Sequence, residues 1–306
     1  MKVLVFGSLN IDYVYSVEHF VQPGETIAST DRQIFCGGKG LNQAVSFAKY
    51  GAGTWISGAV GQGDSGILLE ALRAAGVCTD LVRKKEGPSG HTVIQCTPQG
   101  ENNIILFGGA NQTISREDVD HTLMNFEKGD YLILQNEINQ IPYIMDRAHQ
   151  MGMHIVLNPS PMNDRIFEMP LQYVEYLILN EVEAAAVLKE QQTDVRENPN
   201  GDRLLDALIE KFPDSKIVLT LGGDGALYGY RDKRCRQEIV PVKVVDTTAA
   251  GDTFTGYFMG EIICGKTPEE AMKTAATAAA LAVSRKGAGT SIPDHEEVIR
   301  YMRGSV

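Results

Sequence analysis

Short apolar runs alternate with longer helix-forming stretches through most of this 306-residue chain. The runs are rich in β-branched residues and have the length of buried strands, and several of the stretches between them end at a glycine. Repeated strand–helix–strand units predict an α/β fold with a doubly wound, mostly parallel sheet covered by helices on both faces. The predicted strands are residues 3–6, 54–60, 131–135, 154–157, 176–179, 216–221 and 239–245. The predicted helices are residues 41–50, 65–75, 115–125, 142–150, 181–189, 202–212, 254–264 and 271–283.

Four further extended runs interrupt this alternation, because no helix separates them. Residues 13–17 and 26–35 follow one another directly, and residues 91–97 and 103–107 flank Pro98-Gln99-Gly100, which is a hairpin signal. We expect these runs to form a small β-sheet lid, at about 13–36 and 90–108, inserted into a single domain that spans residues 1–306. A small sheet has exposed edges, which predicts a homodimer through the lid.

The composition is typical of a globular protein, with 43% hydrophobic and 22% charged residues. The net charge of −11 argues against nucleic acid or an anionic membrane as a partner. No apolar run approaches the ~18 residues of a membrane span, and the apolar start is too short for a signal peptide. The five cysteines are scattered without a C-x-x-C pair, which indicates reduced thiols and a cytoplasmic protein. The polar residues 191–200 are expected to form a surface loop.

The segment 246–252, Asp-Thr-Thr-Ala-Ala-Gly-Asp, joins a predicted strand to a predicted helix. Its small residues would place three unencumbered N–H groups at the helix N-terminus, which predicts an anion site. Asp252 lies in the same first turn. It is either a helix N-terminal carboxylate favoured by the dipole, or a general base that deprotonates a hydroxyl while the amides hold a phosphoryl group.

A second segment, residues 37–44 with the sequence Gly-Gly-Lys-Gly-Leu-Asn-Gln-Ala, turns the chain into a helix. Its glycines let the backbone approach a ligand closely. Lys39 and Asn42 lie about one turn apart on the same helix face. A solvated lysine is the alternative, but it would leave the surrounding glycines without a role.

Together, the two segments resemble the paired signatures of the PfkB family of carbohydrate kinases, and the resemblance covers essentially the whole chain. It implies transfer of the γ-phosphoryl group of ATP to a sugar hydroxyl, with O5 of D-ribose as the expected acceptor. In this interpretation Asp252 is the catalytic base, and the amides of Ala250 and Gly251 hold the transferring group. A related kinase of fructose, deoxyribose or a nucleoside is the alternative. A nucleoside kinase would need aromatic stacking surfaces near the lid, which Phe107 alone does not supply.

The resemblance also implies two sets of binding residues. The sugar would be held by polar groups at strand ends and in the glycine-rich segment: Asn10, Asp12, Gly38, Lys39, Asn42, Glu137 and Asp252. ATP would be held by residues that follow later strands and by the last helices: Asn180, Thr220, Gly222, Gly223, Gly225, Gly251 and Ala276.

Two metal sites follow from the same resemblance. Asn180 and Glu183 match an Asn-x-x-Glu motif that would steer Mg²⁺, through water, because this ion prefers hard oxygen ligands. The same pair also fits a helix capping box, and both roles can hold. A monovalent cation, K⁺, would be held by side-chain or carbonyl oxygens of Asp246, Thr248, Ala282, Arg285, Gly287 and Ser291. The alternative is that Arg285 and Lys286 are the basic last turn of a helix that stops at Gly287.

Two other motifs are discounted. Residues 61–66 match the dinucleotide pattern G-x-G-x-x-G, but they lie outside the first strand–helix–strand unit, and Asp64 would face the pyrophosphate. An NAD-dependent oxidoreductase is therefore only a remote alternative. Residues 260–267 match the P-loop pattern, but they follow a helical stretch rather than a strand.

Overall fold

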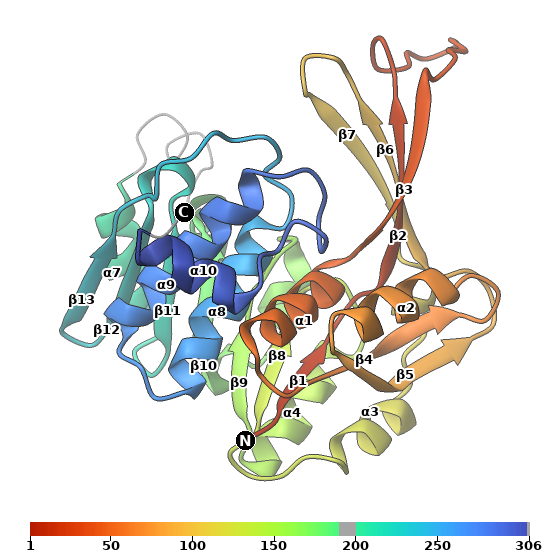
Figure 1. Ribbon diagram of the computed structural model, residues 1–306. Helices are drawn as coiled ribbons and strands as arrows, with labels where there is room; N and C mark the ends of the chain where they lie inside the picture. Colours follow the sequence, from red (N-terminus) through yellow and green to blue (C-terminus); the bar gives the residue numbers. More distant parts are fainter. Residues whose placement is uncertain (190–199, 305–306) are drawn as a thin grey trace.

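The computed structural model describes residues 1–189 and 200–304, so all of the predicted surface loop except Asn200 lies outside the described residues. A nine-stranded sheet forms its centre (Figure 1), in the order β13-β12-β11-β10-β9-β8-β1-β4-β5. Its neighbouring strands are parallel except at one end, where β12 pairs antiparallel with both β11 and β13. In that order, the bounds are Lys233–Gln237, Ala226–Tyr230, Lys216–Thr220, Val174–Asn180, His154–Leu157, Tyr131–Leu134, Val3–Phe6, Thr54–Gly61 and Cys78–Lys85.

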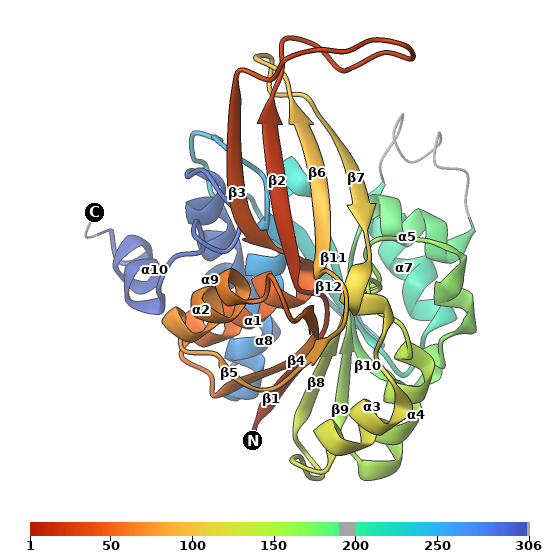
Figure 2. The ribbon, with the colours of Figure 1, turned by 90° about the vertical axis from the view of Figure 1, so that its right-hand side faces the viewer.

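Helices cover both faces of this sheet (Figure 2), as the strand–helix alternation predicts. One face is covered by α1 (Lys39–Tyr50), α2 (Gly66–Ala74), α8 (Ala250–Ile263) and α9 (Pro268–Val283), with α10 (His295–Met302) outside them. The other is covered by α3 (Arg116–Leu123), α4 (Ile141–Met151), α5 (Glu181–Leu188) and α7 (Gly201–Lys211). Alternate residues of β1 enter the two cores, since Val3 and Val5 pack on the first face while Leu4 and Phe6 pack on the second.

A second sheet of four strands projects from the first (Figures 1 and 2), in the order β3-β2-β6-β7. Its strands are Asp31–Gly37, Asn10–Ser16, Gly90–Cys96 and Asn102–Phe107, and the predicted hairpin is the antiparallel pair β6–β7. The strand predicted at 26–35 starts five residues later than expected, at Asp31. Ile104, Ile105, Leu106 and Phe107 of β7 are between 47% and 64% exposed, which is unusual for four consecutive large apolar residues.

The predicted strand at residues 239–245 is wrong. Its apolar residues Ile239, Val244 and Val245 are about half exposed, and no strand is assigned there. The run contains Pro241, which cannot donate to a sheet. Its end is instead tied to α9, because the N–H groups of Val245 and Asp246 both donate to the carbonyl of Val283. The prediction also missed β5, β12 and β13 of the main sheet.

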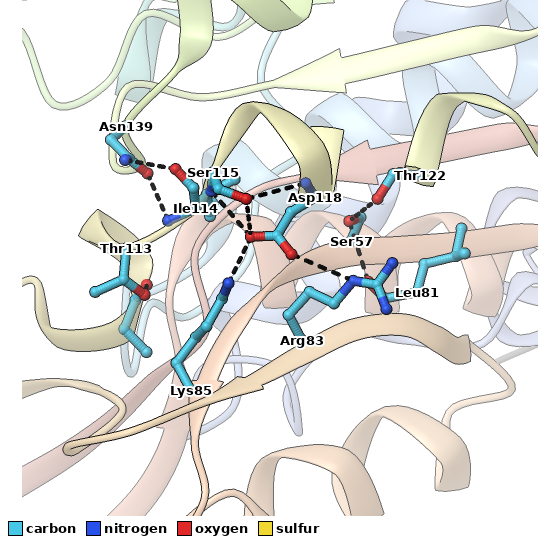
Figure 3. Close-up of polar contacts among 11 residues, drawn as sticks. Ser57, Leu81, Arg83, Lys85, Thr113, Ile114, Ser115, Asp118, Thr122 and Asn139 are labelled. Carbon is cyan, nitrogen blue, oxygen red and sulfur yellow. Dashed lines mark hydrogen bonds and ion pairs between the residues drawn. The ribbon is translucent and has the colours of Figure 1, made fainter. Parts of the chain in front are cut away.

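An ion-pair network fastens the edge strand β5 to α3 (Figure 3). Asp118 accepts a 2.6 Å hydrogen bond from Lys85 Nζ and lies 3.6 Å from Arg83 Nε. It also completes a capping box with Ser115 at the start of α3. Burial opposes ionisation, but the donors of Lys85 and Ser115 hold the pKa of Asp118 below its usual value. The network therefore has a structural role, with Lys85 hydrogen-bonded to Asp118 and Arg83 held by the longer ion pair.

Candidate active site

Polar side chains gather where the parallel strands end, because the carboxyl ends of parallel strands meet at one edge of the sheet. A cavity of about 210 Å³ lies there, between the ends of β9, β10 and β11 and the N-terminus of α8. Predicted site residues that line it are Lys39, Asn180, Glu183, Thr220, Ala250, Gly251 and Asp252. Its other lining residues are Asn158, Ser160, Ile178, Leu179, Thr247, Ala249 and Thr255.

Asp252 is buried in the first turn of α8, with 6% of its surface exposed. Two amides of α1 hold its carboxylate, one on each oxygen. Asn42 Nδ2 lies 3.1 Å from Oδ2, and Gln43 Nε2 lies 3.0 Å from Oδ1. A carboxylate that accepts two oriented hydrogen bonds has a fixed direction, which is what a proton acceptor at an active site requires.

The N-terminus of α8 has N–H groups beside the cavity with no partner among the residues that the structure describes, although fewer than expected. The first intrahelical bond runs from Thr253 N to Ala249 O, so the N–H groups of Gly251 and Asp252 precede it. The N–H of Ala250, in contrast, donates to Thr247 O at 3.3 Å, so the expectation of three unencumbered amides is wrong. Ala249 has a positive φ of 60°, a conformation that alanine rarely adopts and that starts the helix at this point.

Lys39 supplies a positive charge to the cavity. Burial alone would lower the pKa of Lys39, but nearby carboxylates, with Asp252 the strongest influence, raise it overall above its usual value. Gly38 begins this turn with a φ of 93°, and a Cβ there would lie 2.9 Å from the carbonyl oxygen of Ser8. The glycines thus bring the backbone of residues 38–40 against the end of β1, which places the lysine.

The expected sugar contacts lie beside Lys39. Glu137 Oε2 accepts the Lys39 N–H at 3.0 Å and also a short hydrogen bond from Ser8 Oγ. Asp12 accepts a 2.6 Å hydrogen bond from Thr92 Oγ1. Burial raises the pKa of Asp12 to about 6, and the neighbouring charge of Glu137 adds to the rise.

Asn111 is a buried residue that follows β7. Its Nδ2 donates to Asn10 Oδ1 at 2.7 Å and so holds the Asn10 side chain. The other end of Asn111 accepts the Leu9 N–H at 3.0 Å, so its orientation is fixed by the backbone. The Asn10 N–H₂ group therefore takes no part in the contact with Asn111. Hydrogen-bond donors from Asn10 and acceptors from Asp12 and Glu137 together suit a polyhydroxylated ligand.

Asn180 and Glu183 form the capping box that the sequence allows. The Asn180 N–H donates to Glu183 Oε2 at 3.0 Å, and the Glu183 N–H donates to Asn180 Oδ1 at 2.9 Å. Glu183 Oε1 takes no part in this box, and both residues line the cavity. The pair therefore fits a hydrated Mg²⁺, for which oxygen ligands are the required chemistry.

The expected nucleotide residues are only partly brought together. Thr220 lines the cavity, whereas Gly222, Gly223 and Gly225 form a turn beyond it and Ala276 packs on the core from α9. Gly225 has a φ of 87°, and a Cβ there would lie 2.0 Å from the carbonyl oxygen of Gln237. Gly225 thus allows this turn to approach the backbone of Gln237 closely. The glycines of the turn do not line the cavity.

The residues expected to hold K⁺ lie on two segments. Asp246 joins its own turn to the second segment, residues 284–291. Thr248 N and Oγ1 donate to Asp246 Oδ1 at 2.9 and 2.6 Å, and Gly287 N donates to Oδ2 at 3.0 Å. Burial opposes ionisation, but these donors hold the pKa of Asp246 below its usual value. Because α9 ends at Val283, Arg285 lies beyond the helix, and the alternative of a basic last turn is wrong.

Some site residues escaped the sequence prediction. Gln43, Asn158, Thr92 and Asn111 all orient expected site residues or line the cavity. Only Gln43 carried a signal, since it belongs to the same glycine-rich segment as Lys39. The other three contact partners far away in the chain, and sequence spacing does not reveal such contacts.

The two discounted motifs have structural roles. Asp64 of the G-x-G-x-x-G segment accepts hydrogen bonds from Ser89 N and Oγ, which fastens the loop before β6. Gly260 of the P-loop pattern lies within α8, where a Cβ would meet the Tyr50 ring at 2.5 Å.

Among the described helices, none has the length and apolar character needed to cross a bilayer.

The comparisons with known proteins agree with this geometry. The model of the pfkB family of carbohydrate kinases matches residues 1–295, and the chain belongs to this family. It is 31% identical over 302 residues to the ribokinase of Haemophilus influenzae, with 97% of each chain covered. It is 29% identical over 311 residues to the deoxyribokinase of Salmonella typhi, with 99% of each covered. The structure of Arabidopsis thaliana ribokinase complexed with ribose and ATP matches with a TM-score of 0.86 and 30% identity, over 99% of this chain and 98% of that one.

Proposed function

We propose that the chain is an ATP-dependent ribokinase that converts D-ribose to D-ribose 5-phosphate. The observation that carries this function is the buried Asp252 carboxylate, which is held by two amides beside the free N–H groups of α8. The ribokinase relatives support ribose and ATP as the substrates. The chain belongs to a kinase family, and the Asp64 carboxylate is hydrogen-bonded to Ser89. The alternative of an NAD-dependent oxidoreductase is therefore without support.

In the proposed reaction, Asp252 takes the proton of the sugar hydroxyl as its oxygen forms a bond to the γ-phosphorus. The bond from that phosphorus to the bridging oxygen breaks, and ADP leaves. The N-terminus of α8, through Gly251, and the charge of Lys39 stabilise the transferring group. Phosphoryl transfer depends mainly on such positioning and charge stabilisation.

The sugar would lie between Asn10, Asp12, Gly38 and Glu137, and ATP along Asn180, the turn 220–225 and Ala276. We assign residues 1–306 to one kinase domain and the second sheet, about 13–36 and 90–108, to its lid. A cytoplasmic location fits the need for ATP and the reduced cysteines, and fractionation of the producing cells would test it.

The substrate is tested by ADP release with D-ribose, deoxyribose, fructose, tagatose and adenosine. We expect the highest kcat/KM with D-ribose. Preference for deoxyribose, the named substrate class of the Salmonella relative, would support the second candidate function instead. Absence of ADP release with every sugar would contradict a sugar kinase.

Magnesium would be steered by Glu183 and Asn180, where it would neutralise phosphate charge. Glu183→Gln is expected to raise the Mg²⁺ concentration needed for half-maximal rate, because one carboxylate is lost from the cavity. Glu181→Gln, on the same helix turn but not in the cavity lining, is the matched control. An unchanged Mg²⁺ titration for Glu183→Gln would contradict the assignment.

A monovalent cation, K⁺, would be held by Asp246 and Ser291 together with carbonyl oxygens of Thr248, Ala282, Arg285 and Gly287. It would order the turn that carries the anion site, so we expect K⁺ to raise kcat at fixed Mg²⁺. The measurement compares K⁺, Na⁺ and a bulky organic cation at constant ionic strength. Equal rates with all three would show that the loop needs no ion.

The exposed apolar strand β7 supports a homodimer through the lid. Light scattering at micromolar concentration should give twice the chain mass. Ile105→Asp, at the most exposed of the four β7 residues, should shift the protein toward the monomer. The control is Ile67→Asp, an exposed apolar residue of α2 outside this sheet. A monomeric wild-type protein would rule the interface out.

A further inference from the structure

Gln43 is the second amide on Asp252, and it is not among the predicted site residues. Its side chain is fully buried, and its Nε2 lies 3.0 Å from Asp252 Oδ1. The two ends of a glutamine amide have opposite polarity. Its nitrogen attracts the carboxylate, whereas its oxygen would repel it. The orientation of this one amide therefore decides whether Asp252 is held or displaced.

The orientation of the Gln43 amide is fixed by the backbone carbonyl of Ile178, which acts through the side chain of Asn158. The Ile178 carbonyl can only accept, so the Asn158 Nδ2 that lies 2.9 Å from it must donate. Asn158 consequently turns its Oδ1 toward Gln43, 3.4 Å from Nε2. From the other side, Gln135 Nε2 donates to Gln43 Oε1 at 2.7 Å. Asn158 thus fixes the orientation of Gln43, and the contact with Gln135 is consistent with it.

Among the described residues, this arrangement leaves two buried acceptors unpaired, Asn42 Oδ1 on the neighbouring amide and Gln135 Oε1. Gln135 Oε1 is buried and has no hydrogen-bond partner among the residues that the structure describes. Rotating the Gln135 amide would not help, because its oxygen would then face Gln43 Oε1. A buried acceptor without a partner is costly and calls for an explanation. The orientation of Gln43 toward Asp252 supplies one.

We propose that Gln43 is a positioning residue for the catalytic base, with its amide orientation set by Asn158 and satisfied by Gln135. The inference rests on the proposed function of Asp252. Asn42 holds the other oxygen, so the two neighbouring amides of α1 prevent the carboxylate from rotating. One side of each oxygen stays available for the sugar hydroxyl. Gln43 itself contacts neither the sugar nor the phosphates in this assignment.

The test is a double-mutant cycle with Gln43→Met, which keeps the side-chain volume but removes the donor. We expect kcat to fall about 10- to 100-fold, as for the loss of a charge-assisted hydrogen bond. The KM for ATP should stay within about threefold. In the Asp252→Asn background, Gln43→Met should lower kcat by less than about threefold, because the carboxylate it positions is gone.

Ser46→Ala is the matched control. Ser46 also joins α1 to α8 through a buried hydrogen bond, from Oγ to Thr253 O at 3.0 Å, but does not touch Asp252. It should keep the wild-type kcat even if the melting temperature falls. An equal effect of Gln43→Met with and without Asp252, or a wild-type kcat in the single variant, overturns the inference. If Asp252→Asn itself keeps full activity, the proposed function fails, which is a separate outcome.

Discussion

Asp252→Asn is expected to lower kcat by about 10²–10⁴-fold, the range typical of a lost general base. The substitution keeps the size of the side chain, so the fold and sugar binding should remain. An asparagine oxygen can still accept from Asn42 or Gln43, but the amide cannot take a proton from the hydroxyl. The measurement is the single-turnover and steady-state rate of ADP release with saturating ribose, ATP and Mg²⁺.

The control for this prediction is sugar affinity measured by calorimetry, together with the melting temperature. Both should be close to wild type. A variant with near-normal turnover would show that Asp252 only stabilises the start of α8, the alternative that its position at the helix N-terminus allows. Loss of sugar binding together with a lower melting temperature would instead show misfolding of the site, and loss of binding alone would show that Asp252 mainly holds the sugar.

Gly37→Ala is expected to raise the KM for sugar by about 100-fold, the range for losing hydrogen bonds to a buried charged group. A Cβ at this position would lie 1.9 Å from Asp12 Oδ2, so the Asp12 carboxylate must rotate away from the sugar side. The strand itself can accept alanine, because Gly37 does not have a positive φ. The KM for ATP, measured at saturating sugar, should therefore change little.

The same substitution at Gly63 gives the comparison, because nothing lies within 4 Å of a Cβ there. Gly63→Ala should leave both KM values unchanged. If Gly37→Ala raises the two KM values equally, the second sheet has shifted as a whole and the effect cannot be assigned to Asp12. An unchanged KM for sugar would show that Asp12 does not contact the substrate.

The main sheet could be predicted from the sequence where strands are buried on both faces. Such strands as β1, β8 and β9 are short apolar runs, which is a strong local signal. The strands β5 and β13 lie at the edges and are partly polar, with runs such as Arg83-Lys84-Lys85, so they lack it. Residues 239–245 show the opposite error, since β-branched residues there have no neighbouring strand to pair with.

The candidate site could be predicted where its residues share one segment. Lys39 and Asn42 lie on one turn, and Ala250 to Asp252 form one helix start, so their proximity follows from local geometry. The contact between Gln43 and Asp252 joins residues 209 positions apart, and that between Asn111 and Asn10 joins residues 101 apart. Pairs of this kind depend on how the helices and the second sheet pack, which no local pattern specifies.

The buried carboxylate of Asp12 links the sugar site to folding stability. Its pKa of about 6 lies above that of an exposed aspartate, mainly because of burial. The folded protein thus holds this proton more tightly than the unfolded chain does, and the contribution of Asp12 to stability falls as the pH rises from about 4 to about 6. Above that window the free protein retains the full cost of an ionised, poorly solvated carboxylate. A sugar hydroxyl that donates to Asp12 would offset this cost, so substrate should protect the fold more at pH 7.5 than at pH 5.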